Sequence, residues 1–158
     1  MPGTQATNSI LPGHLDHVKL INLLGYQLAQ ATIPTNRIFK THIEAEFDLN
    51  KLEFTILMLA AANDEVTPKR LSSAMNIPGP NLTLILDRLE KRELLQRVRS
   101  DLDRRVQYVQ LTRKGSALVK KLDGVVAKME EALLAHLSAA ERAMLFELLR
   151  KVAVHRRG

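Results

Sequence analysis

The spacing of apolar residues predicts a chain made mostly of helices. From Leu15 towards Ile43, apolar side chains recur every three or four residues, which is the period of one helix face. Pro34 lies inside this segment, and a proline removes one backbone donor and clashes with the preceding turn. We therefore predict a long N-terminal helix with a kink or a break near residues 31–34.

Capping residues indicate where the following helix begins. Asn50, with Glu53 three residues later, resembles a capping box with asparagine in place of serine or threonine. It predicts a buried helix over residues 51–62. Its expected apolar stripe consists of Leu52, Ile56 and Leu59, with Phe54 and Leu57 beside it.

Two further helices are predicted close together. Thr67 followed by Pro68 is typical of a helix start, and Asn76 can end this short helix in a left-handed turn. The second helix is predicted over residues 81–93, where Leu82, Ile85, Leu86 and Leu89 have helical spacing. Two helices joined by a turn of about four residues form a helix-turn-helix.

Beyond Glu93 the apolar period changes from about 3.6 residues to about 2. Apolar and polar side chains largely alternate over residues 95–99 and 105–111, which predicts an antiparallel hairpin with residues 100–104 at its tip. The tip lacks glycine, so we expect a loop longer than a two-residue turn. The expected fold is mainly α-helical with a small β-hairpin wing, which is the pattern of a winged helix-turn-helix.

Two helices are expected after the hairpin. Thr112 caps a long helix with an apolar stripe that continues to Leu133. Ser138 and Glu141 form a capping box that opens the last helix.

The net charge of the chain lies in one central segment. Residues 69–114 hold eleven basic and five acidic residues, which accounts for the whole formal charge of +6. A helix fits the major groove of DNA, and a basic ribbon beside it reaches phosphates or the adjacent minor groove. The charge alone does not distinguish double-stranded DNA from a solvated face that only aids solubility, and it is the position of the charge on the helix-turn-helix and the hairpin that favours DNA as the partner.

Composition excludes several other classes of protein. The 158 residues are 46% hydrophobic and 25% charged, which is enough for one domain with a core and excludes a disordered tail protein. The absence of cysteine excludes disulfides, thiolate metal sites and cysteine nucleophiles. Because we find no membrane-spanning segment and no secretory signal, we expect a cytoplasmic protein without a membrane partner.

No catalytic arrangement can be assembled from the sequence. A glycine-rich phosphate loop, a nucleophile elbow and a pair of catalytic carboxylates are all missing, so we expect no enzyme and no cofactor. His14 with His17, and His42 with Glu46, have helical spacing, which leaves a zinc-sensing protein as an alternative. We expect no metal site, because the long helix after Thr112 lacks two histidines four residues apart.

The central segment resembles the MarR family of bacterial transcription regulators. The resemblance rests on the run from Leu86 to Leu95, on Arg97 and Ser100, and on three motifs that follow: Asp103-Arg104-Arg105, Val109-Gln110-Leu111-Thr112 and Gly115. It is most specific over residues 50–116, and the outer helices match the family in length and pattern only.

Membership of this family implies a homodimer that represses genes until a small ligand, often a phenol or an aromatic carboxylate, releases it. It implies dimerisation through the helices of residues 13–46 and 113–158, around a DNA-binding lobe of residues 47–112. We expect residues 1–12 to form a flexible arm, because they lack periodicity and carry two prolines. The expected operator is a pseudo-palindrome with half-sites about 10 base pairs apart. The alternative is a winged-helix module for protein contacts or nonspecific DNA binding.

The resemblance assigns roles to three residues of the hairpin. Arg105 matches the wing arginine that enters the minor groove, where a planar, weakly hydrated cation is suited to a narrow A·T tract. Arg104 matches a contact to the DNA backbone. Asp103 matches the wing acid that orients a nearby arginine, and its alternative is a turn residue that pairs across the hairpin.

In the second helix of the helix-turn-helix, the outward side chains are expected to read the major groove. They are Asn81, Thr83, Leu84, Asp87 and Arg88. Leu84 departs from the family, since several members place an arginine there to read guanine. Either Leu84 packs on thymine methyl groups while Asn81 and Thr83 provide polar readout, or DNA shape and the wing carry the specificity. Pro78-Gly79-Pro80 also departs, because it replaces a frequent serine or aspartate cap.

An effector pocket is expected in the crevice between the first two helices and the lobe that carries the wing, near Pro34. The candidates to meet a carboxylate are His17, Asn36 and Arg37, with Tyr26 and Phe39 as aromatic walls. Each residue has an alternative place at a dimer interface or on the surface.

Overall fold

The computed structural model describes residues 15–154. The arm predicted for residues 1–12, together with His14 and His155, lies outside the described residues. The chain divides between Ile38 and Phe39 into two units, and each unit is described by itself.

The first unit contains helix α1 (Leu24–Phe39) except for its last residue. The helix predicted from Leu15 begins only at Leu24, because the preceding residues form turns. In one of them, Asp16 Oδ1 accepts a hydrogen bond from the Val18 amide at 2.9 Å. Local side-chain hydrogen bonds of this kind compete with helix formation.

Pro34 lies inside α1 without interrupting it, so of the predicted kink or break near residues 31–34 the break is wrong, and the kink stays a prediction. Threonine hydroxyls supply hydrogen bonds to backbone carbonyls on either side, from Thr32 to Leu28 O at 2.8 Å and from Thr35 to Ala31 O at 2.7 Å. These bonds add donors to the turns around the proline, whose own donor is missing. The irregular segment comes later, as the π-helical turn η1 (Lys40–Glu44), which leads into α2 (Ala45–Phe47).

Helix α3 (Lys51–Ala61) begins with the predicted capping box. Asn50 Oδ1 accepts the Glu53 amide at 3.0 Å, and Glu53 Oε2 accepts the Asn50 amide at 3.0 Å. The buried stripe differs from the prediction, because it consists of Glu53, Ile56, Leu57 and Ala60, while Leu52 is 43% exposed. The capping box thus turns an acidic side chain towards the core.

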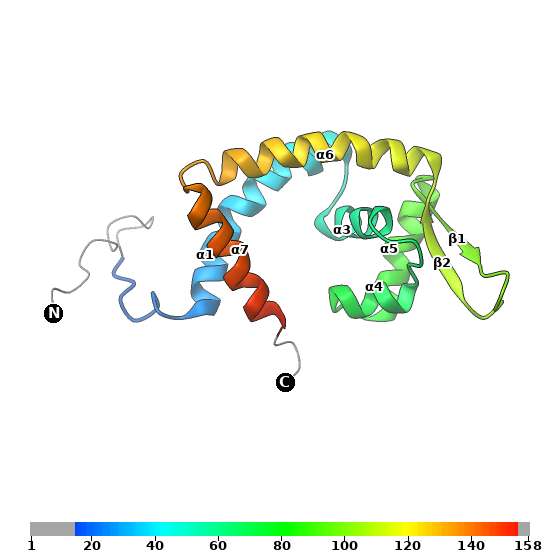
Figure 1. Ribbon diagram of the computed structural model, residues 1–158, viewed down its shortest axis with the longest axis horizontal. Coiled ribbons are helices and arrows are strands. Elements are labelled where there is room, and N and C mark those ends of the chain that lie inside the picture. Colours follow the sequence, from blue (N-terminus) through cyan, green and yellow to red (C-terminus); the bar gives the residue numbers. More distant parts are fainter. Residues whose placement is uncertain (1–14, 155–158) are drawn as a thin grey trace. The chain divides into compact units, whose positions relative to one another are not determined.

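Helices α4 (Pro68–Met75) and α5 (Gly79–Lys91) form the predicted helix-turn-helix (Figure 1). The Thr67 hydroxyl accepts the Arg70 amide at 3.2 Å, and Asn76 ends α4 in the left-handed conformation with φ 51°. After α5, Glu93 is also left-handed, and the Leu94 amide bonds to Leu89 O at 3.0 Å. This is the Schellman arrangement of a helix end.

Strands β1 (Leu95–Arg99) and β2 (Gln107–Leu111) form the antiparallel hairpin that is the wing. The Val109 amide of β2 also donates to Val66 O at 2.7 Å, which attaches the hairpin to the chain just before α4. The second strand begins two residues later than predicted, so Arg105 lies in the loop and not in the strand. The reason is a turn in which the Val106 amide donates to Asp103 O at 2.9 Å.

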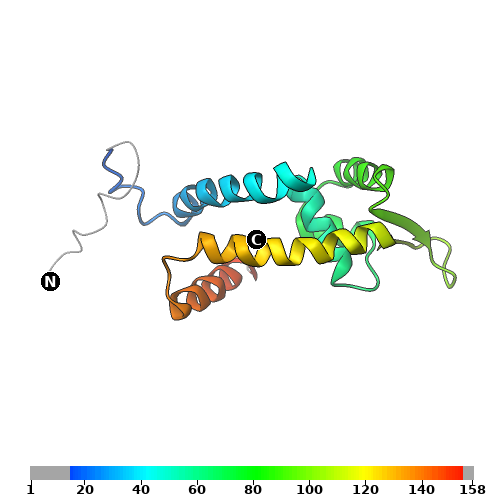
Figure 2. The same ribbon diagram turned by 90° about the horizontal axis from the view of Figure 1, so that it is seen from above.

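Helix α6 (Arg113–Leu133) runs from the wing towards α7 (Ala139–Val154), as Figure 2 shows from above. The predicted caps are confirmed: Thr112 accepts the Gly115 amide at 3.0 Å, and Ser138 exchanges hydrogen bonds with Glu141. No residue of α7 is buried within a single chain.

The core of the second unit lies among η1, α3, α5, α6 and the hairpin. Its fully buried aliphatic side chains include Ile43, Leu49, Ile56, Leu86 and Leu122. The chain is therefore mainly α-helical with a two-stranded antiparallel wing, as predicted.

Candidate nucleic-acid interface

Helix α5 presents one apolar face to the core and one polar face to solvent. Leu82, Ile85, Leu86 and Leu89 are buried, as their spacing predicts. On the other face Asn81 and Thr83 are exposed, and Leu84 is 65% exposed. Asn81 thus offers an amide and Leu84 an isobutyl group, which suit a groove that offers acceptors and thymine methyl groups, while the Thr83 hydroxyl donates to Gly79 O at 3.0 Å within the helix.

The N-terminus of α5 has the missing cap that the sequence predicts. Pro78 occupies the N-cap position, and no side chain there accepts a hydrogen bond from the first turn. The free amides of a first turn carry partial positive charge and are suited to a phosphate oxygen.

The loop of the wing carries Arg104 and Arg105, both exposed. Asp103 Oδ1 accepts the Arg105 backbone amide at 2.9 Å, so this carboxylate shapes the loop through the main chain of the arginine. Ser100 Oγ accepts the amides of Leu102 and Asp103 at 3.2 and 3.3 Å. The loop is thus internally hydrogen-bonded, and both of its arginines are exposed to solvent.

Arg97 of β1 joins the wing to α5 through two carboxylates. Its Nη2 atom binds Asp87 Oδ1 and also Glu90 Oε2 at 2.6 Å, and its Nε atom binds Glu90 Oε2 at 3.0 Å. Hydrogen bonds from this guanidinium lower the pKa of the Glu90 carboxyl, and the two carboxylates raise the pKa of Arg97. Asp87, expected to face the groove, is instead half-buried in this ion pair. We call Arg97, Asp87 and Glu90 the clamp.

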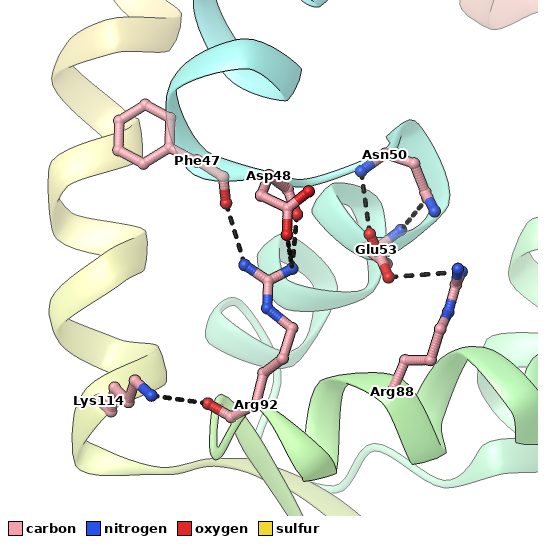
Figure 3. A network of polar contacts seen from close by, with 7 residues as sticks. All are labelled: Phe47, Asp48, Asn50, Glu53, Arg88, Arg92 and Lys114. Atoms are coloured by element: carbon pink, nitrogen blue, oxygen red, sulfur yellow. Dashed lines mark hydrogen bonds and ion pairs between the residues drawn. The ribbon is translucent and has the colours of Figure 1, made fainter.

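Arg88 is exposed over 57% of its side chain but is also tied to the protein (Figure 3). Its Nη2 atom lies 3.4 Å from Oε1 of Glu53, whose side chain is 7% exposed. Glu53 is the charged residue that the described chain buries, and its other oxygen serves the capping box of α3. A phosphate that draws Arg88 outward would therefore weaken its ion pair with the buried Glu53 carboxylate. A buried charge that loses its partner destabilises the protein.

The C-terminal end of α5 is anchored to two other helices (Figure 3). Arg92 donates to the backbone oxygens of Phe47 and Asp48 at 3.0 and 2.5 Å, at the end of α2. Lys114 of α6 donates to Arg92 O at 2.9 Å. These cations stabilise carbonyl groups at helix ends, so part of the central positive charge serves the fold.

A polar hollow of about 410 Å³ adjoins this network. It is lined by Glu44, Asp48, Asn50, Glu53, Arg88, Lys91 and Arg92. None of the predicted effector-binding residues contributes to it.

The structure brings two of the predicted effector residues together. The Nδ1 atom of His17 and the hydroxyl of Tyr26 form a hydrogen bond, and their rings are 5.7 Å apart. Asn36 and Arg37 lie on the same helix as Tyr26 but about 15 Å further along its axis, from the rise per residue. Phe39 is buried against Phe54 at a ring distance of 5.5 Å, so it belongs to the core and not to a pocket wall.

Residues 15–154 contain neither a candidate metal centre nor a candidate membrane span. Nowhere in this range do three or more His, Asp or Glu side chains gather in a way that could hold a metal ion. Within the same range, every helix is too short or too polar to cross a membrane.

The clamp and the buried Glu53 are the features that the sequence analysis missed. For Glu53 a signal was available, because it lies three and four residues before Ile56 and Leu57 and so shares their helix face. For Arg97 no local signal exists, since Asp87 lies ten residues away in another element.

Comparison with known proteins agrees with this geometry. Residues 38–122, more than half of the chain, match the family described as transcriptional regulator SarA/Rot. The transcriptional repressor CouR, solved bound to a 23-mer DNA duplex, is 33% identical with a TM-score of 0.78, over 89% of this chain and 99% of that chain.

Two other solved structures are similar. A mutant of MarR from E. coli, complexed with operator DNA, is 26% identical with a TM-score of 0.75, over 87% of this chain and 99% of that chain. BpsR of Bordetella bronchiseptica, whose structure concerns regulation of DNA binding by 6-hydroxynicotinic acid, is 26% identical with a TM-score of 0.75, over 84% and 94% of the two chains. The chain therefore belongs to the SarA/Rot family of transcriptional regulators and has the winged helix-turn-helix fold of the MarR type.

Proposed function

We propose that this protein is a repressor that binds a pseudo-palindromic DNA operator as a homodimer and is released by a small aromatic carboxylate or phenol. The observation that carries the proposal is the pairing of an outward polar face on α5 with an arginine-bearing wing, in the segment that holds the net charge of +6. The similarity to CouR, which was solved on a DNA duplex, supports the same conclusion.

Within this function, α5 lies in the major groove and the wing reaches the adjacent minor groove. Asn81 and Thr83 read base edges, while Leu84 packs on thymine methyl groups. Arg105 enters the minor groove, Arg104 binds the backbone, and Asp103 supports the loop that carries them. Arg88 contacts DNA only at the expense of its ion pair with Glu53.

A second copy of this chain covers the apolar faces of the terminal helices. Leu24, Leu28 and Ile33 on α1 are each at least 41% exposed, and so are Phe146 and Leu148 on α7. Exposed apolar side chains on helices of this length are typical of obligate dimer interfaces. Two copies related by a two-fold axis present two recognition helices to half-sites about 10 base pairs apart.

The effector is a small aromatic carboxylate or phenol, by analogy with 6-hydroxynicotinic acid on BpsR. The paired rings of His17 and Tyr26 offer an aromatic surface with polar groups, and Asn36 and Arg37 are the further candidates on α1. Calorimetry with a panel of aromatic acids checks this placement. Binding that is unchanged in both His17→Ala and Arg37→Ala would show that the site is elsewhere.

The DNA-binding roles are tested by measuring the affinity of the protein for two duplexes across a range of salt concentrations. One duplex is selected from a random DNA library by its binding to the protein, and the other has the same bases in scrambled order. Arg105→Ala should weaken specific binding and relax the preference for A·T flanks. Lys114→Ala should at most weaken binding to all duplexes alike, because Lys114 bonds to Arg92 O. Identical effects of the two variants would contradict this division of roles, and equal affinity of the wild type for every duplex would instead indicate a nonspecific module.

A further inference from the structure

We propose that Arg97 is a positioning residue for DNA binding, which fixes the angle between α5 and the wing so that both grooves are contacted at once. The inference rests on the proposed function, because it concerns the geometry of the same interface. Arg97 itself does not touch DNA in this proposal, and it acts through the position of Arg105.

Within the clamp, Glu90 binds the backbone of strand β1 as well as the side chain of Arg97. Glu90 accepts the guanidinium of Arg97 at Oε2 and the backbone amide of Arg97 at Oε1, at 3.1 Å. Asp87 and Glu90 lie three residues apart, on one face of α5. A single residue of β1 is thus fastened to one helical turn by both its backbone and its side chain.

Arg97 also belongs to the cross-strand pair at which the opposite edge of the hairpin is attached to the rest of the chain. We call each cross-strand pair of the hairpin a rung. In the register of the hairpin Arg97 pairs with Val109, and the Val109 amide donates to Val66 O at 2.7 Å. This rung is therefore held by α5 on one side and by the chain before α4 on the other. Beyond it lie the rungs of Val98 and Arg99 and the loop with Arg105, whose residues are largely exposed.

The loss of one attachment would leave the wing to pivot on the other. The loop lies at the outer end of the hairpin, so a small rotation at the Arg97 rung is enlarged at Arg105. Contacts that need a narrow groove lose most when a charged group is misplaced by about 1 Å. The side chain of Arg97 is 20% exposed, so its ion pairs are partly shielded from water.

The charge of Arg97 is occupied within the protein. Its Nη2 and Nε donors are directed at Asp87 and Glu90, and the lowered pKa of Glu90 reflects the same hydrogen bonds. The positive charge of Arg97 is thus balanced by two carboxylates within the protein in this geometry. Its removal should leave the salt dependence of binding unchanged, unlike the removal of a phosphate contact.

A double-mutant cycle between Arg97 and Arg105 tests the proposal. Affinity for the selected duplex is measured by fluorescence anisotropy for wild type, Arg97→Ala, Arg105→Ala and the double variant. We expect Arg105→Ala to weaken binding about tenfold in the wild type but less than about threefold when Arg97 is alanine. The matched control is Arg99→Ala on the same strand, in which the effect of Arg105→Ala should stay at about tenfold.

Additive effects of Arg97→Ala and Arg105→Ala would overturn the proposal, because a residue that only stabilises the fold weakens all contacts alike. Glu90→Gln provides a second route that keeps the arginine and should also reduce the effect of Arg105→Ala. Additivity in that background would overturn the proposal as well. Failure of the proposed function is distinguishable, since the wild type would then bind scrambled and selected duplexes equally.

Discussion

Gly115, the third residue of α6, allows the start of that helix to lie against the turn between α5 and the wing. A β-carbon at this position would lie 1.8 Å from the backbone oxygen of Leu94 and 2.9 Å from its carbonyl carbon. The same oxygen accepts the Thr112 amide at 3.2 Å. Replacement by alanine therefore forces backbone to move, and the hydrogen bond that joins Leu94, just before β1, to the N-cap of α6 is strained.

The expected change in the free energy of unfolding follows from two opposing effects. The separation from Leu94 O must grow from 1.8 Å to at least 3.0 Å, and the obstacle is backbone that cannot rotate away. Overpacking of this kind costs about 3 kcal/mol or more, at the upper end of its range. Alanine favours the helix over glycine by about 1 kcal/mol, which offsets part of this cost. We expect Gly115→Ala to lower the free energy of unfolding by about 2 kcal/mol or more.

Urea unfolding followed by circular dichroism measures this change, at one fixed protein concentration because unfolding of the proposed dimer would depend on concentration. Gly124→Ala is the matched control, since it lies on the same helix and nothing approaches its β-carbon position within 4 Å. The control should be about 0.5–1 kcal/mol more stable than wild type. A Gly115→Ala variant as stable as this control would refute the reasoning.

Three further predictions concern a cap, the dimer and the clamp. Asn50→Ala removes the acceptor of the Glu53 amide and should lower the free energy of unfolding by about 1 kcal/mol in urea, and an unchanged midpoint would contradict the role of the cap. Leu148→Glu places a charge on the exposed apolar face of α7 and should shift the sedimentation of the protein from dimer to monomer, whereas an unaltered dimer would place the interface elsewhere. Because the folded-state pKa of Glu90 is lowered, its contribution to stability is complete above the unfolded value of about 4.3 and is lost as the pH falls through the lower folded value. Carbon-13 NMR of the Glu90 carboxyl should show that Arg97→Ala raises this pKa, and equal values in both proteins would argue against the clamp.

Features governed by neighbouring residues were predicted well from the sequence. The caps at Asn50, Thr67, Thr112 and Ser138 all form, because a cap depends on residues within one helical turn. The left-handed end of α4 at Asn76 is likewise local. The order of the central helices and the wing follows from these signals and from the change of apolar period.

Two other kinds of feature were predicted poorly. In α1 the cause is local, because a turn in which Asp16 accepts the Val18 amide precedes the helix, and hydroxyl groups of Thr32 and Thr35 donate to carbonyl groups on either side of Pro34. At the candidate site the cause is a contact between distant elements. The outward face of α5 was predicted, but the pairing of Asp87 with Arg97 joins two elements and has no periodic signature. The DNA contacts of Arg104 and Arg105 stay predictions.

Selection of bound duplexes from a random DNA library, at about 150 mM salt where purely electrostatic binding is weak, tests the central claim most directly. The expected result is an enriched inverted repeat with half-site centres about 10 base pairs apart and A·T pairs where the wings lie. The absence of any enriched sequence, despite good binding at low salt, would show that the basic segment is only a patch for polyanions.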